Sequence, residues 1–201
     1  MVTFRELRSG AGGQVPGGAM HRFARAVRAT RSEGFAGATL GAATLAMGLI
    51  AGVFYSFACS VMLGLARTDD RTFIEVMQRI NEEIINPVFF SSFFGALVLS
   101  IVALVLQRRL GAREATRWIA AALALYALVL VVTMAANVPL NDALAAAGDP
   151  HTISDPASVR HQFEGPWVAW NIVRGAASLL ALGCLARALV LHGRTARAKV
   201  A

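Results

Sequence analysis

The stretch GPWVAWNIVRGAASLLALGCLARAL, from Gly165 to Leu189, reads as a membrane-spanning helix with a charged residue, Arg174, in its middle. A helix needs about 20 apolar residues to cross a bilayer, and the segment 166–186 contains no other charge. A guanidinium near the centre of such a helix costs about 2.5–3.5 kcal/mol on insertion scales. The rest of the chain must therefore provide Arg174 with polar partners, or its side chain must reach water.

Three further segments of the chain, 34–66, 84–107 and 118–141, contain no charged residue at all. With 56% hydrophobic and 15% charged residues among 201, this pattern predicts an all-α protein, an integral membrane four-helix bundle. The transmembrane domain is expected over residues 34–191, with spans near 35–65, 87–107, 118–141 and 166–190. The first apolar run is about twice as long as the core of a cleaved signal peptide, so we expect it to remain as a span.

Arginines concentrate in a leader (1–33), a loop (108–117) and a tail (192–201), whereas the other two loops, 67–86 and 142–166, are acidic. Because short cytoplasmic loops are enriched in Lys and Arg, both termini are predicted to be cytoplasmic, in a bacterial inner (plasma) membrane. The Gly- and Arg-rich leader is predicted to be disordered. The net charge of +7 lies at membrane flanks, so membrane lipids are the expected partners and nucleic acid is not.

The two acidic, extracytoplasmic loops are each expected to contain a short amphipathic helix. In the first loop, apolar residues recur at helical spacing: Phe73, Met77, Ile80 and Ile84. We expect this face to be buried against the bundle as a lid, with Glu75 and Glu82 in water. Asn86, which precedes a proline, is predicted to cap the second span, and residues 155–163 are predicted to form the second surface helix.

Polar residues of the spans are expected to meet at the outer end of the bundle. On the fourth span five residues share one face: Trp167, Trp170, Asn171, Arg174 and Ser178. On the third span Asn137 and Asn141 share a face, and Pro139 between them leaves a carbonyl without its helical donor. This arrangement predicts a polar pocket. In the alternative, Arg174 snorkels to the headgroups and the asparagines only join helices.

Four motifs resemble, in order and spacing, the anthrone-oxygenase-like family of small four-helix integral membrane proteins, which is catalogued as a domain of unknown function. They are GLIAGVFYSFACSVMLGL (48–65), FIEVMQRINEEIINPVFFSSFFGAL (73–97), NVPLNDAL (137–144) and WVAWNIVRGAASLLAL (167–182). The resemblance covers about residues 38–190. It places Asn81, Asn86, Pro87, Asn137, Pro139, Asn141, Trp170, Asn171 and Arg174 at motif positions. It implies an oxidoreductase that converts anthrones to anthraquinones with molecular oxygen, as in polyketide pathways.

An anthrone has an acidic benzylic carbon, whose anion can react with oxygen. A site for this reaction needs a base, donors for an oxyanion and a flat apolar slot. We expect the catalytic residues to be Arg174, Asn171, Asn141 and Asn137, and the substrate-binding residues to be Tyr55, Phe54, Asn81, Asn86, Trp167 and Trp170. Four loop residues are candidates for the base: Glu83, Asp142, His161 and Glu164.

No cofactor other than oxygen as co-substrate is expected, because the four histidines show no metal-ligand spacing. The predicted function is therefore a membrane-embedded oxygenase acting on a flat, lipid-soluble phenolic or polyketide-type molecule. Two alternatives remain. One is a non-catalytic membrane protein that binds a quinone, a lipid or a partner helix, and the other is a purely structural four-helix subunit.

Overall fold

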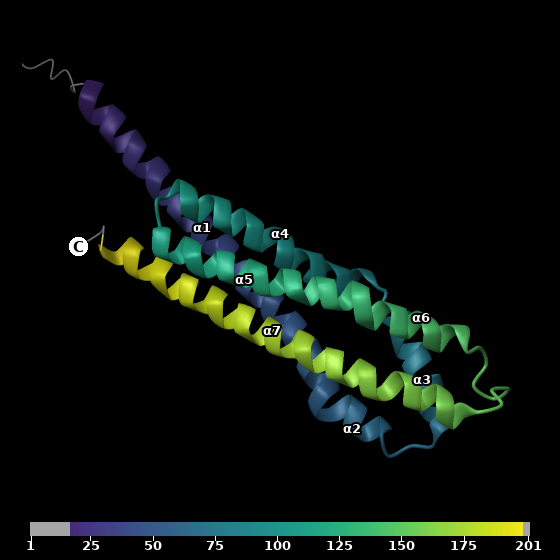
Figure 1. Cartoon of the computed structure of the whole chain (residues 1–201). Helices are drawn as coiled ribbons and strands as arrows, with labels where there is room; N and C mark the ends of the chain where they lie inside the picture. Colours follow the sequence, from purple (N-terminus) through teal and green to yellow (C-terminus); the bar gives the residue numbers. More distant parts are fainter. Residues whose placement is uncertain (1–16, 199–201) are drawn as a thin grey trace, which may run out of the picture. The chain divides into compact units, whose positions relative to one another are not determined.

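A computed structural model describes the backbone of residues 17–198 and the side chains of residues 30–195, and all regular elements in this part are helical (Figure 1). The chain divides into two compact units, Met1–Phe35 and Ala36–Ala201. Helix α1 (Gly17–Ser56) begins in the first unit and continues in the second. The remaining elements belong to the second unit, which contains the pocket described below.

The second unit consists of long helices joined by short connections. After α1 come η1 (Phe57–Val61), α2 (Met62–Leu65), α3 (Asp70–Glu83), α4 (Pro87–Arg109), α5 (Arg113–Val132), η2 (Thr133–Asn137), α6 (Val138–Ala146) and α7 (Pro156–Ala198). The elements η1 and η2 are single π-helical turns that join α1 to α2 and α5 to α6 without ending the helix. Gly111 and Gly148, both with positive φ, form the turns after α4 and α6.

Four helical stretches are long and apolar enough to cross a membrane, which confirms the predicted fold class. They are Thr30–Leu65, Pro87–Arg109, Arg113–Ala146 and Pro156–Thr195. Their outer faces expose large apolar side chains such as Leu45 and Val131, at 74% and 62%, as expected for contact with lipid. The last two stretches are longer than predicted. The third extends beyond residues 118–141 at both ends, and the fourth starts ten residues before Pro166, which is accommodated within a continuing helix.

Two sequence-based predictions need correction. Residues 1–16 of the predicted disordered leader lie outside the described residues, but from Gly17 onward the leader is part of α1, since Ala and Arg are good helix formers. Residues 155–163 do not form a separate surface helix. Asp155 accepts a hydrogen bond from the backbone N–H of Ser158, and the helix that starts there is α7 itself. The amphipathic helix predicted in the first acidic loop is confirmed as α3.

The core of the bundle is built largely from small and aliphatic residues. α5 packs against both α4 and α7. Alanines at buried positions, among them Ala96, Ala122 and Ala181, let the helix backbones approach closely. The hydroxyl of the buried Tyr126 donates to the carbonyl oxygen of Phe93 at 2.7 Å, so a polar group in the core keeps a partner.

Helix α3 is fixed against α6, α7 and the loop between them. Phe73, Ile74 and Met77 are fully buried, whereas Ile80 and Ile84 are half-buried, so the predicted apolar face is only partly covered. The side chain of Gln78 donates to the carbonyls of Leu144 and Gly148 at 2.9 and 3.0 Å. Arg71 and Arg160 add further bonds to the surrounding main chain: Arg71 to Pro150 and Ile153, and Arg160 to Ala66 and Thr68.

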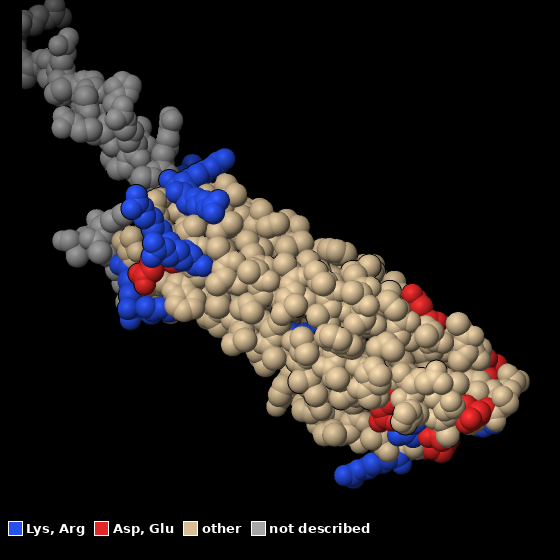
Figure 2. All heavy atoms as spheres, viewed as in Figure 1, with Lys and Arg blue, Asp and Glu red and all other residues tan. Residues whose placement is uncertain are grey.

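The two ends of the second unit differ in charge (Figure 2). The end of α4, the first turns of α5 and the last turns of α7 carry arginines, including Arg108, Arg109, Arg113, Arg117 and Arg194. The end with α3 carries most of the acidic residues, including Asp69, Asp142 and Asp149. We call this second end the acidic end. The side of the membrane that it faces remains a prediction from the arginine pattern.

Candidate active site

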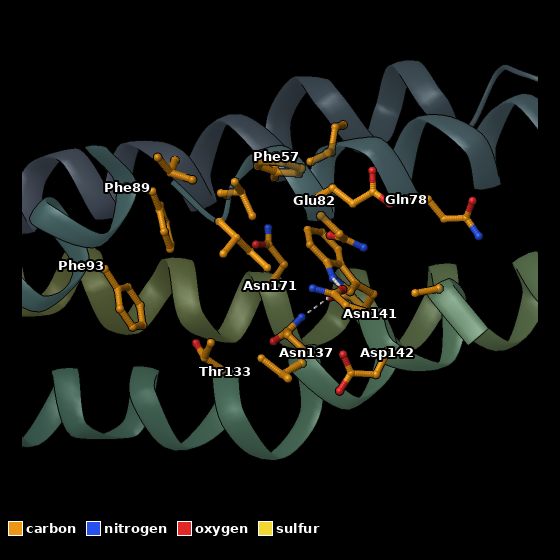
Figure 3. A pocket seen from close by; sticks show the side chains of 18 of the residues that line it. Phe57, Gln78, Glu82, Phe89, Phe93, Thr133, Asn137, Asn141, Asp142 and Asn171 are labelled. Carbon is orange, nitrogen blue, oxygen red and sulfur yellow. Dashed lines mark hydrogen bonds between the residues drawn. The ribbon is translucent and has the colours of Figure 1, made fainter. Parts of the chain in front are cut away.

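A cavity of about 790 Å³ lies toward the acidic end of the bundle. α1, η1, α3, α4, η2, α6 and α7 all contribute residues to its walls. Figure 3 shows Phe89 and Phe93 at one end of the cavity and Gln78 and Glu82 at the other, with Asn137 and Asn171 between them. The cavity is therefore apolar at one end, rich in amides in the middle and polar at the other end.

Arg174 lies in the wall of this cavity and is only 7% exposed. Its Nη2 donates to Oδ1 of Asn171 at 3.1 Å. Its Cζ lies 4.4 Å from the centre of the Phe54 ring and 5.6 Å from that of Trp167. The guanidinium thus points between the helices rather than toward the headgroups, and aromatic faces stabilise its charge.

Asn171 joins Arg174 to the first span. It is 1% exposed, and its Nδ2 donates to the carbonyl oxygen of Phe54 at 3.0 Å. Since both ends of this carboxamide are bonded, its orientation is determined by its partners. A Cβ added at Gly175, the residue after Arg174, would lie 3.6 Å from the Phe54 Cβ, which shows how closely α1 and α7 approach here.

The two asparagines of the third span bind Trp167 on α7. Oδ1 of Asn141 accepts a hydrogen bond from the indole Nε1 at 2.8 Å. Nδ2 of Asn137 donates to the main-chain carbonyl of Trp167 at 3.4 Å, and Asn137 is 1% exposed. The indole, held at its N–H, packs against Phe57 and Phe163 with ring centres 5.5 and 6.1 Å apart. All four predicted catalytic residues therefore border one cavity.

Three buried polar atoms of the cavity lining lack a hydrogen-bond partner within the described protein. They are Nε of Arg174, Oδ1 of Asn137 and Nδ2 of Asn81. The first and third are donors and the second is an acceptor. Buried polar groups are rarely left unpaired, because each costs about 1–3 kcal/mol. This set fits a ligand that brings both an acceptor oxygen and a hydroxyl donor.

Both π-helical turns contribute to the cavity. η1 follows Phe54 and supplies Phe57, while η2 supplies Thr133, Met134 and Asn137. Single π turns inside α-helices are rare and frequently occur at functional sites. The sequence does not reveal them, since no residue type specifies such a turn.

Aromatic residues of α4 form a wall that the sequence analysis did not assign. Phe89 and Phe93 are stacked at 5.3 Å with an interplanar angle of 22°, and Phe90 and Phe94 are stacked at 5.7 Å and 24°. All four line the cavity. The sequence FFSSFF could have predicted this wall, because its phenylalanines are paired at a spacing of four, and residues four apart lie on one helix face.

Carboxylates lie only in the polar part of the cavity. Of the four candidate bases, Asp142 alone lines it, together with Glu82 and Asp149, which the sequence analysis did not propose. Glu164 accepts a hydrogen bond from Arg160 at 2.7 Å instead. Glu82 was expected simply to face water. It is exposed, but it also borders the cavity because α3 forms one of the walls.

Three of the predicted substrate-binding residues lie elsewhere, while Phe54, Asn81 and Trp167 line the cavity. Tyr55 and Trp170 are 58% and 43% exposed, since each is next in sequence to an inward-facing residue and so points about 100° away. Asn86 caps α4, where its Oδ1 accepts from the N–H groups of Val88 and Phe89, both at 3.0 Å. It is therefore a capping residue, as the sequence also predicted.

No cluster of three or more His, Cys, Asp or Glu side chains capable of holding a metal occurs among the described residues. Cys59 and Cys184 are free thiols.

Comparison with known proteins gives a family match over residues 88–184, to the anthrone oxygenase family. No curated protein and no solved structure matches the chain. The matched region includes Asn137, Asn141, Asn171 and Arg174. It begins at residue 88, after the motif in the first span and after α3. Over this region, just under half of its length, the chain is similar to the anthrone oxygenases, which confirms the family resemblance indicated by its motifs.

Proposed function

We propose that the protein is an oxygenase that uses molecular oxygen to convert an anthrone-type phenolic substrate to the corresponding quinone in the cavity. The observation that carries this proposal is the set of unpaired buried atoms, Arg174 Nε, Asn137 Oδ1 and Asn81 Nδ2, beside an aromatic wall. A flat aromatic ring with a carbonyl and a hydroxyl group satisfies that set. The similarity to anthrone oxygenases supports the same assignment.

Arg174 is suited to stabilise an oxyanion. Its charge is permanent, Asn171 fixes one of its nitrogens, and the buried Nε has no hydrogen-bond partner within the described protein. Removal of a proton from the benzylic carbon of an anthrone places negative charge on the carbonyl oxygen opposite. Donors already in place for that oxygen lower the barrier, typically by about 3–4 kcal/mol for one donor.

Asp142 is our proposed base, since it is the one carboxylate of the third span that lines the cavity. In Figure 3 it lies near Asn137 and Asn141. The reaction then needs only substrate and oxygen. Asp142 takes a benzylic proton, and the carbanion passes one electron to oxygen, giving a carbon radical and superoxide. Their combination forms the carbon–oxygen bond of a peroxide anion, and the proton held by Asp142 is transferred to its terminal oxygen.

The peroxide yields the quinone by elimination. The second benzylic hydrogen leaves as a proton, its electron pair forms the new carbonyl π bond, and the oxygen–oxygen bond breaks. The departing hydroxide takes up a proton and becomes water. One molecule of oxygen is thus consumed for each quinone and each water formed, and the protein supplies proton transfer and charge stabilisation.

The proposal is tested by anthrone-dependent oxygen uptake in detergent or vesicles. Purified wild type should consume one oxygen per quinone, and Arg174→Lys should lose most of the rate, because an ammonium cannot reproduce the planar fork of donors. Arg117→Lys, a change at an exposed position, is the matched control. Equal rates for wild type and Arg174→Lys would exclude the oxyanion role. No rate in any sample, together with tight binding of a hydroxyanthraquinone, would indicate a binding protein instead.

A further inference from the structure

On the side of the bundle, apolar side chains that border the cavity are also exposed, and they are distinct from the residues of its polar end. Phe90 and Phe94 of α4, Met134 of η2 and Val138 of α6 line the cavity, and we call these four residues the lateral opening. The first three are 38%, 52% and 66% exposed. These side chains therefore border the cavity and also reach the outer surface of the bundle.

The lateral opening lies within the stretches that can cross a membrane. Phe90 and Phe94 belong to the apolar helix Pro87–Arg109, and Met134 and Val138 belong to Arg113–Ala146. All four side chains are apolar, so the surface around the opening is suited to lipid and poorly suited to water. α5 packs against α4 along the bundle, whereas α6 packs mainly against α3 and α7. α4 and α6 are therefore not packed closely against each other beside the cavity.

The polar end has the opposite chemistry. Gln78, Glu82, Asp142 and Asp149 line it, and Glu82, Asp142 and Asp149 are exposed. This end is suited to water and to proton exchange. To enter at this end, a flat apolar molecule dissolved in the bilayer would first have to leave the membrane and expose its surface to water. That exposure costs about 25 cal/mol per Å² of apolar surface.

We infer that the substrate enters and the quinone leaves through the lateral opening, directly between the bilayer and the cavity, while the polar end exchanges only water and protons. This inference rests on the proposed function for the class of ligand. A molecule that passes between Phe90 and Met134 meets the aromatic wall of α4 first and the Arg174–Asn171 pair further in. Its carbonyl end must therefore enter ahead of the rest of the molecule.

The test uses capture of 1,8-dihydroxyanthraquinone, a stable product-like probe, by the protein in lipid vesicles. Trp118→Phe and Trp170→Phe leave Trp167, in the cavity wall, as the remaining tryptophan of three. Its fluorescence reports binding. Cys59→Ser and Cys184→Ala then allow a single new cysteine to be modified with N-cyclohexylmaleimide, which adds bulk at one chosen position.

Three positions are compared: Met134→Cys in the lateral opening, Glu82→Cys at the polar end, and Val131→Cys as control. Val131 precedes Met134 by one helical turn and is similarly exposed, at 62%, but does not line the cavity. Modification at Met134→Cys should slow capture severalfold, and modification at the other two should leave it unchanged. Slowing at Glu82→Cys alone would place access at the polar end and overturn the inference.

The result also separates this inference from the proposed function. Capture that is equal after modification at Met134→Cys and Val131→Cys would overturn the lateral route but leave the cavity as the binding site. Failure of the unmodified protein to capture the probe would reject the cavity as a quinone site, and the route with it.

Discussion

The carboxamide of Asn171 bonds to the guanidinium of Arg174 on the same helix, at 3.1 Å from Oδ1 to Nη2, and to the first span through its other end. A change at Asn171 should therefore act on the charge of the site as well as on packing.

Asn171→Asp should weaken ligand binding. Because it also replaces the donor to the Phe54 carbonyl by an acceptor, which costs stability, Kd is compared on folded protein at matched concentration. The new carboxylate would lie beside the guanidinium of Arg174, pair with it and compete with any ligand oxyanion. A hydrogen bond to a charged group contributes about 1.5–3 kcal/mol, so we expect Kd for dihydroxyanthraquinone to rise roughly tenfold or more. Asn86→Asp makes the same chemical change at a helix cap, where Asp serves equally well, and should leave Kd unchanged.

Asp142→Asn should lower the rate of oxygen consumption by about 10²–10⁴, the usual contribution of a general base. Binding of the quinone should persist, because the substituted amide has nearly the same shape as the carboxylate that it replaces. Glu82→Gln, at another of the three carboxylates of the polar end, is the comparison and should retain most of the rate. The opposite pattern would transfer the role of base to α3.

Gly37→Ala should disturb the far end of the bundle from the cavity. A Cβ at position 37 would lie 2.8 Å from Nε2 of His192, whose ring nitrogen Nδ1 pairs with the side chain of the buried Gln107 at 3.0 Å. Displacement of the ring breaks that bond, and we expect a loss of about 1–3 kcal/mol in unfolding free energy. In a His192→Ala background, where the clash and the bond to Gln107 are both absent, Gly37→Ala should cause little further loss. An equal loss in both backgrounds would show that the contact does not limit this position.

Asp69→Ala should loosen α3 in a pH-dependent way. Asp69 accepts hydrogen bonds from the Oγ1 and the N–H of Thr72, and these bonds hold the pKa of its carboxyl below the ordinary value. The ionised cap therefore stabilises α3 at neutral pH, and this contribution is lost as the pH falls below about 4 and through the lowered pKa. Hydrogen exchange of α3, corrected for intrinsic rates, should show this loss in wild type but not in Asp69→Asn, whose side chain does not titrate.

Cysteines on opposite ends should label from opposite sides of the membrane. The arginine pattern predicts that Ser154→Cys, in the loop before α7, reacts with an impermeant maleimide added outside, and that Arg113→Cys reacts only after the membrane is opened. The reverse result would place the cavity toward the cytoplasm.

The sequence was sufficient for the spans and for the polar face of α7. Arg174, Asn171 and Trp167 lie at helical spacing, and a straight helix places them together without any tertiary information. That Asn141 and Trp167 lie at the same end of the bundle followed from the antiparallel order of the spans, whereas the hydrogen bond between them was not predicted.

Other parts of the site depend on tertiary structure. Whether Phe54 or Tyr55 faces inward is decided by how α1 packs on α7, and adjacent aromatic residues give no preference. Glu82 and Asp149 lie 67 positions apart in the chain and meet one cavity only because Gln78 ties α3 to the loop after α6.

The two π turns explain why the bundle is hollow where it is. From Ala36 to Phe54 the buried positions of α1 recur every three or four residues, and the next is Met62, eight further on. In the third span the buried positions Val129 and Val132 are three apart, and the next, Asn137 at the end of the second π turn, is five further on, eight from Val129. In a regular helix, side chains seven residues apart, or two turns, lie on the same face. An interval of eight contains one extra residue, which the wide π turn accommodates. The regular layers of core side chains are therefore interrupted at η1 and at η2. Phe57 of η1 and Thr133 of η2 border the cavity at these interruptions. Deleting one residue from each turn would restore the repeat and close the cavity.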